Sequence, residues 1–136
     1  MSDLPQSIHI TEEGPREGFQ FEKNPVATKR KIELINALSE TGVKHIQAVS
    51  FVNPKAVPQM ADADDVVRGL RLKESVDYTA LWLNRQGFER ALATGRLHMG
   101  GYLALTASET FLRRNQNRSM EDNIAAQREM AAVYTS

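Results

Sequence analysis

The sequence contains no cysteine, which excludes disulfide bonds and thiolate metal sites and suits a reducing compartment. It also lacks any apolar run long enough to span a bilayer, and its first residues lack the basic-then-apolar pattern of a signal peptide. We therefore expect a cytoplasmic protein that does not enter a membrane.

Neither sign of charge is in excess, since 17 Lys and Arg residues balance 17 Asp and Glu residues. Generic binding to nucleic acid needs a surplus of positive charge along a phosphate backbone, so this class of partner is not expected. A small anionic ligand remains compatible with the composition, because a local cluster of cations is enough to bind it.

The composition, 41% hydrophobic and 25% charged, is that of an ordinary globular protein, and we expect one domain over residues 1–136. Apolar patterning predicts strands alternating with helices at intervals of about 30 residues, which is typical of βαβ units and a parallel sheet. The strands are expected at residues 8–11, 44–51, 76–83 and 98–106, and the helices at 28–40, after Asp62, at 85–94 and after Ser119.

Four such units fall short of a (β/α)8 barrel, which takes about 250 residues, so the chain has the length of roughly half a barrel. The pattern alone is equally compatible with a small flavodoxin-like open sheet. In either architecture the outer strands would leave unpaired backbone that another unit should cover.

Polar side chains follow each predicted strand, where the loops of a parallel α/β fold converge on one opening. After the first strand, Gly14-Pro15 breaks the regular backbone and Arg16, Glu17 and Gln20 follow. The later strands are followed by Ser50, Asn84 and Ser108, respectively.

Two motifs in this order resemble the 3-hydroxy-3-methylglutaryl-CoA lyase family: Gly-Pro-Arg-Glu-Gly-Phe-Gln at residues 14–20 and Ser-Phe-Val-Asn-Pro-Lys-Ala-Val-Pro-Gln-Met-Ala-Asp at 50–62. The similarity continues through Asn84, Gly87-Phe88-Glu89 and Ala107-Ser108-Glu109. It covers nearly the whole chain but only the first half of the family's barrel. The resemblance therefore favours an α/β fold that is the parallel (β/α)4 half of a TIM barrel.

The resemblance implies a metal-dependent lyase that cleaves a 3-hydroxyacyl-CoA into acetyl-CoA and acetoacetate. Glu17 would be a ligand of a divalent cation, Mg2+ or Mn2+, and Arg16 would be the catalytic cation that stabilises the developing enolate. Gln20, Ser50, Asn84 and Ser108 would contact the acyl-CoA substrate.

The chain departs from the family at two positions, since the family usually has Asp where Glu17 stands and Glu where Gln47 stands. The family's other metal ligands, a His-x-His pair and an Asn, belong to later strands. The only histidines here are His9, His45 and His98, and none forms such a pair. We therefore expect little or no turnover from this chain alone.

Two other functions remain open. The chain could be a non-catalytic half-barrel that forms a homo-oligomer or pairs with a missing second half-barrel. It could also be a divergent lyase or aldolase acting on a related acyl-CoA or 2-oxo acid, as the changes at Glu17 and Gln47 suggest. Coenzyme A phosphates could be bound by Arg113, Arg114 and Arg118. Loop arginines are nevertheless usually solvated, and the same holds for the basic run at residues 29–31.

Overall fold

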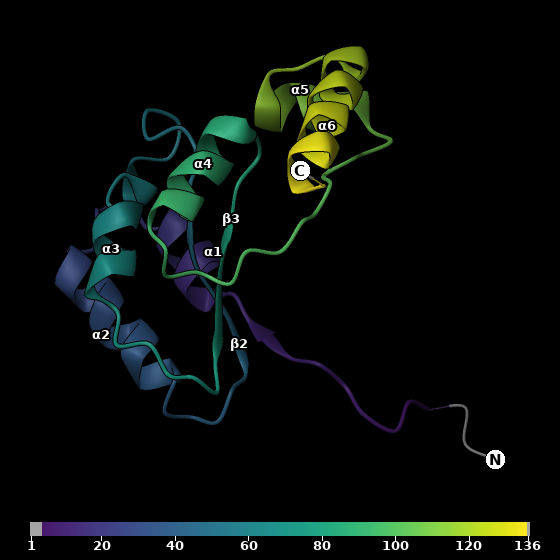
Figure 1. Cartoon of the computed structure of the whole chain (residues 1–136). Helices are drawn as coiled ribbons and strands as arrows, with labels where there is room; N and C mark the ends of the chain where they lie inside the picture. Colours follow the sequence, from purple (N-terminus) through teal and green to yellow (C-terminus); the bar gives the residue numbers. More distant parts are fainter. Residues whose placement is uncertain (1–3, 136) are drawn as a thin grey trace.

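The computed structural model describes residues 4–135 as a three-stranded sheet surrounded by helices (Figure 1). The strands are β1 (Thr11–Glu12), β2 (His45–Ser50) and β3 (Asp77–Leu81). The helices are α1 (Gly14–Gln20), α2 (Thr28–Leu38), the 3-10 helix η1 (Pro58–Met60), α3 (Ala63–Gly69), α4 (Arg85–Ala93), α5 (Glu109–Gln116) and α6 (Met120–Tyr134).

The sheet has the order β1-β2-β3, and both strand pairs are parallel. Thr11, His45 and Asp77 stand at the same level across the three strands, and the register shifts at a bulge between Gln47 and Val49. In a (β/α) barrel, successive strands are likewise parallel neighbours that are joined by helices. The parallel α/β half-barrel class is thus confirmed.

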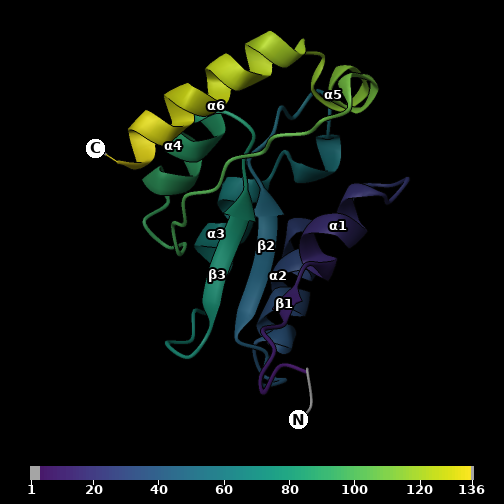
Figure 2. The same ribbon diagram turned by 90° about the vertical axis from the view of Figure 1, so that its right-hand side faces the viewer.

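One face of the sheet forms the hydrophobic core with the helices. Figure 2 shows α2 and α3 on the same side of β2 and β3. Burying these apolar side chains, each worth about 1.5–3 kcal/mol if large, is the main force that holds the helices on the sheet. Core residues from the two strands and the two helices include Ile35, Ile46, Ala48, Val66, Val67, Tyr78 and Ala80.

The opposite face of β2 and β3, which we call the inner face, is polar. Side chains in a strand alternate between faces, so His45 and Gln47 lie on the inner face with Asp77 and Thr79, which are their partners in register. All four are half-buried, in contrast to the buried residues between them. The inner face therefore offers polar groups at these four positions.

The expected fourth strand at 98–106 was wrong, because among the described residues this segment forms no strand. The backbone N–H of His98 donates to the backbone carbonyl of Tyr78 at 2.7 Å, as in a neighbouring strand. The pairing does not continue through Gly100 and Gly101, since glycine weakens a strand interior. Further along this segment, side chains of α6 form hydrogen bonds with the backbone of Ala104. Gln127 accepts its N–H at 2.9 Å, and Asn123 donates to its carbonyl at 3.3 Å.

The expected first strand was placed too early, since β1 is only two residues long and ends next to α1. The segment before β1 runs away from the body of the fold (Figure 1). Arg113 and Arg114, expected in a loop, instead lie in the helix α5, and Ser108 caps it by accepting the N–H of Phe111 at 3.2 Å. The helix expected after Ser119 is confirmed as α6, which begins with a capping box formed by Ser119 and Asp122.

The basic run at the start of α2 is only partly solvated. Lys29 and Arg30 are exposed, but Lys31 is 2% exposed and binds the carboxylate of Asp62 at 2.6 Å. Lys31 also donates to the carbonyl of Gln59, so it ties α2 to the turn before α3. None of the helices in the described part of the chain is long and apolar enough to cross a membrane.

Candidate functional site

Arg16 is the centre of the candidate site. Its side chain is 10% exposed, and each of its three guanidinium nitrogens has a partner. NH1 lies 2.6 Å from Glu17 Oε1, NH2 lies 2.5 Å from Glu13 Oε2, and Nε donates to the amide oxygen of Gln47 on the inner face. Gln47 thus links α1 to β2, and the two glutamates neutralise the buried cation.

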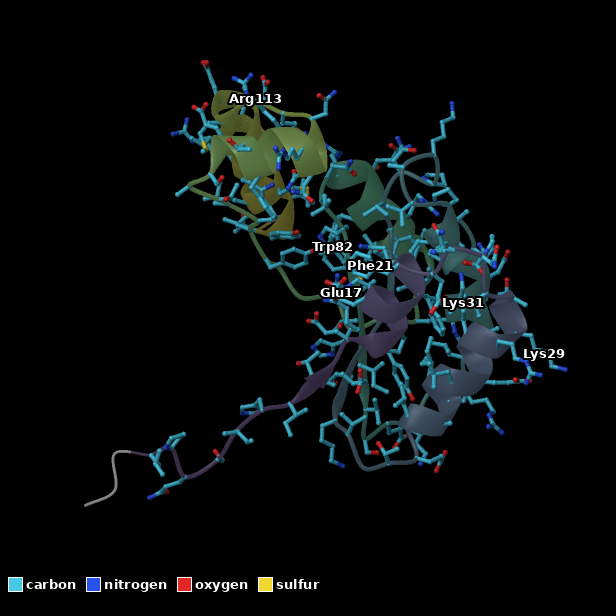
Figure 3. All side chains as sticks on the ribbon, turned by 180° about the vertical axis from the view of Figure 1, so that it is seen from behind. Glu17, Phe21, Lys29, Lys31, Trp82 and Arg113 are labelled. Carbon is cyan, nitrogen blue, oxygen red and sulfur yellow. The ribbon has the colours of Figure 1, made fainter. Side chains whose placement is uncertain are left out.

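The sequence places Arg16 there by starting a helix where β1 ends. Gly14 and Pro15 form the first turn of α1, a position that suits proline because its missing N–H has no intrahelical acceptor. Arg16 and Glu17 were therefore correctly expected after the first strand, although they lie in a helix and not in an irregular loop. Figure 3 shows Glu17 on α1, near the middle of the molecule.

Asn84 follows β3, as expected, whereas Ser50 is the last residue of β2 and does not follow it. Ser50 is fully buried and its hydroxyl has no hydrogen-bond partner among the described residues. Asn84 caps α4 by accepting the N–H of Gly87 at 2.8 Å. Asn84 also borders a pocket of about 330 Å³ whose other lining residues are Phe51, Val52, Asn53, Pro54, Lys55, Gln86, Gly87 and Arg90.

Tyr102 fixes the end of β3, a role that the sequence pattern did not predict. Its hydroxyl accepts the backbone N–H of Trp82 at 2.7 Å and donates to the carbonyl of the same residue. Burial raises the pKa of Tyr102 to about 12, and the positive charge of Arg16 partly opposes this shift. Its link to Trp82, 20 residues away, leaves no signal in the sequence.

The residues that were expected to contact the substrate are not bonded to Arg16. Gln20 is half-buried at the end of α1, and Ser108 is exposed at the start of α5. Within residues 4–135, no hydrogen bond or ion pair joins Gln20, Ser50, Asn84 or Ser108 to Arg16. Arg113 lies on α5 at one end of the molecule (Figure 3).

The described residues do not fit a complete metal site. No group of three or more His, Asp or Glu residues among them could hold a metal ion. Glu17 Oε1 is already engaged by Arg16. His45 and His98 both face Asp77, with Nδ1 to carboxylate distances of 3.1 and 3.5 Å, at the amino end of β3 and away from α1.

A family model described as HMGL-like matches residues 7–136. Among individual proteins, the mitochondrial hydroxymethylglutaryl-CoA lyase of Rattus norvegicus is 46% identical over 123 residues. That match covers 90% of this chain and 37% of the rat protein.

Two solved structures are similar in fold and sequence. Hydroxymethylglutaryl-CoA lyase from Pseudomonas aeruginosa matches with a TM-score of 0.81 and 42% identity, over 92% of this chain and 41% of that one. An HMG-CoA lyase from Acinetobacter baumannii, in complex with coenzyme A and 3-methylmalate, matches with a TM-score of 0.82 and 32% identity. This match covers 96% of this chain and 42% of that one. The chain therefore spans about two fifths of the length of these relatives.

Proposed function

Because this chain belongs to the HMGL-like family, which its sequence matches over residues 7–136, we propose that it carries part of the active site of a 3-hydroxy-3-methylglutaryl-CoA lyase. The observation that carries the proposal is the buried Arg16, held by Glu13, Glu17 and Gln47 beside the carboxyl ends of parallel strands. Functional side chains of (β/α) barrels gather at that end of the sheet.

In the proposed reaction a base removes the proton of the 3-hydroxyl group, the adjacent carbon–carbon bond breaks, and the products are acetoacetate and the enolate of acetyl-CoA. Arg16 is the group of this chain suited to stabilise that enolate. A guanidinium fixed before the reaction needs no reorganisation when negative charge develops, which is where most electrostatic catalysis comes from. Protonation of the enolate then gives acetyl-CoA.

The proposal includes a divalent cation, Mg2+ or Mn2+, with Glu17 as the ligand contributed by this chain. Such a cation would act as a Lewis acid toward substrate oxygens. One carboxylate does not define its coordination, so the other ligands would come from the remainder of a barrel of the relatives' length. We derive no catalytic step through the cation from this chain.

For the substrate, we propose an acyl-CoA, in line with the coenzyme A bound by the Acinetobacter baumannii relative. The expected contacts are Ser50, whose buried hydroxyl lacks a partner, Asn84 beside the 330 Å³ pocket, and Gln20 and Ser108. A related acyl-CoA or 2-oxo acid is the alternative. The cytoplasmic location stays a prediction, since the rat relative is named as mitochondrial.

A second candidate function, association of half-barrels, is favoured by exposed apolar residues. Ile8 and Ile10, 73% and 63% exposed, precede β1, while Leu103 and Leu105, 48% and 61% exposed, lie in the segment expected to be the fourth strand. Exposed apolar side chains of this kind favour burial against a second copy or a complementary half-barrel. Light scattering tests self-association, because a stable monomer at all concentrations would exclude it.

Complementation tests the lyase proposal. The chain would be co-expressed with the part of the Pseudomonas aeruginosa enzyme that the match leaves uncovered, and acetyl-CoA release would be followed with Mn2+ present. We expect turnover that Arg16→Gln abolishes, while Arg30→Gln, which removes an exposed arginine of α2, leaves it unchanged. An assembled pair whose turnover survives Arg16→Gln would contradict the role of Arg16.

A further inference from the structure

The amino end of α1 carries two adjacent glutamates that have different partners. Glu12 Oε1 accepts the backbone N–H of Gly14 at 2.6 Å. Glu13 is the N-cap residue of α1, yet its side chain does not cap the helix. Its carboxylate binds Arg16 instead, with Oε2 at 2.5 Å from NH2. Two neighbouring carboxylates therefore serve separate purposes.

Glu13 is free to bind Arg16 because the N–H groups at the start of α1 have other acceptors. The N–H of Gly14 goes to Glu12, and Pro15 has none. The N–H groups of Arg16 and Glu17 both reach the backbone carbonyl of Glu13, at 3.0 and 2.8 Å. With these donors satisfied, the side chain of Glu13 is not needed as a cap.

Glu13 also gives Arg16 a negatively charged partner, which Gln47, its partner on β2, is not. Gln47 accepts Nε–H of Arg16 through a neutral amide, so it cannot balance a buried guanidinium. Only Glu13 and Glu17 are anionic partners of Arg16 in the described part of the chain. If Glu17 turned its carboxylate to another ligand, Glu13 would be the one remaining anion on the guanidinium.

We propose that Glu13 is a positioning residue that holds the Arg16 guanidinium in place independently of Glu17. The inference rests on the proposed function, in which Arg16 stabilises an enolate while Glu17 binds a cation. Those two roles compete if Glu17 alone fixes Arg16, because one carboxylate, with Oε1 already on the guanidinium, would have to serve both the guanidinium and the cation. Glu13 and Gln47 together remove the conflict by holding NH2 and Nε.

The test follows rotation of the Arg16 guanidinium by nitrogen-15 NMR of arginine side chains in the 136-residue chain. Glu17→Gln should leave the rotation rate close to that of the unchanged chain. Glu13→Gln combined with Glu17→Gln should raise the rate by about tenfold or more, the scale of one lost charge-assisted hydrogen bond. Glu12→Gln is the matched control, since it removes a neighbouring charge without touching Arg16.

Two results would overturn the proposal. If Glu17→Gln alone frees the guanidinium as much as the double variant does, Glu13 holds nothing. If the double variant rotates no faster than Glu12→Gln, other contacts fix Arg16. Far-ultraviolet circular dichroism checks that each variant is folded. The measurement needs neither cation nor lyase turnover, so its failure is distinct from failure of the proposed function.

Discussion

Replacing Tyr102 with Phe removes a single hydroxyl group that serves two backbone groups of Trp82. The hydroxyl accepts the Trp82 N–H at 2.7 Å and donates to the Trp82 carbonyl. Trp82 is 3% exposed, so water has little access to either group. The aromatic ring itself, whose centroid lies 5.3 Å from that of the Trp82 ring, would be retained in the Phe variant. The substitution therefore isolates the two hydrogen bonds.

The expected loss follows from what each backbone group forfeits. A buried donor or acceptor left without a partner costs about 1–3 kcal/mol, so two such groups should lower the free energy of unfolding by about 2–6 kcal/mol. Tyr134→Phe is the matched control at the same tryptophan. It removes one hydrogen bond, from Trp82 Nε1 at 2.7 Å, and should cost about 1–2 kcal/mol.

Urea unfolding followed by tryptophan fluorescence measures both losses, because Trp82 is the only tryptophan in the chain. With a slope near 2 kcal/mol per molar urea, the midpoint of Tyr102→Phe should fall by about 1–3 M. A midpoint no lower than that of Tyr134→Phe would refute the assignment of two backbone bonds to Tyr102.

Three further predictions concern other positions. Since burial raises the pKa of Tyr102 to about 12 from its usual value near 10, the free energy of unfolding should fall as pH rises through this window, and tyrosinate absorbance would show the late titration. Gly87→Ala should destabilise by about 1–3 kcal/mol in urea, because its new Cβ would overlap the carbonyl of Phe51, whereas Gly18→Ala, with nothing within 4 Å, should not. Hydrogen bonds from Ser119 lower the pKa of Asp122, so its support of α6 should be lost as pH falls through that lowered pKa, and Asp122→Asn should remove this acid-dependent loss of helical circular dichroism.

The parts of the fold that depend on local pattern were predictable from the sequence. Alternating and continuous apolar residues marked β2 and β3, and cap residues marked the starts of α4 at Asn84 and α6 at Ser119. Gly95, with φ of 61°, directly follows the C-cap Thr94 of α4, as expected of a glycine that ends a helix, whereas Gly42, with φ of 92°, lies three residues beyond the C-cap Ser39 of α2. These features depend on residues within one turn or one strand.

The features that sequence reasoning missed depend on distant partners. The segment 98–106 has the composition of a strand, but Ala104 is held by Asn123 and Gln127 of α6. The position of Arg16 after β1 was predictable, whereas its bond to Gln47, 31 residues away, was not. The inner face likewise became visible only once the register of β2 and β3 was known.

Under the proposed function, this chain carries only part of a lyase site, with Arg16 and Glu17 present and the other cation ligands supplied from elsewhere. The most direct test is acetyl-CoA release by the 136-residue chain alone, given 3-hydroxy-3-methylglutaryl-CoA and Mn2+. We expect no turnover above the rate of a Glu17→Gln control. Turnover that depends on Mn2+ and is lost in Glu17→Gln would contradict it, because the chain would then hold a sufficient ligand set by itself.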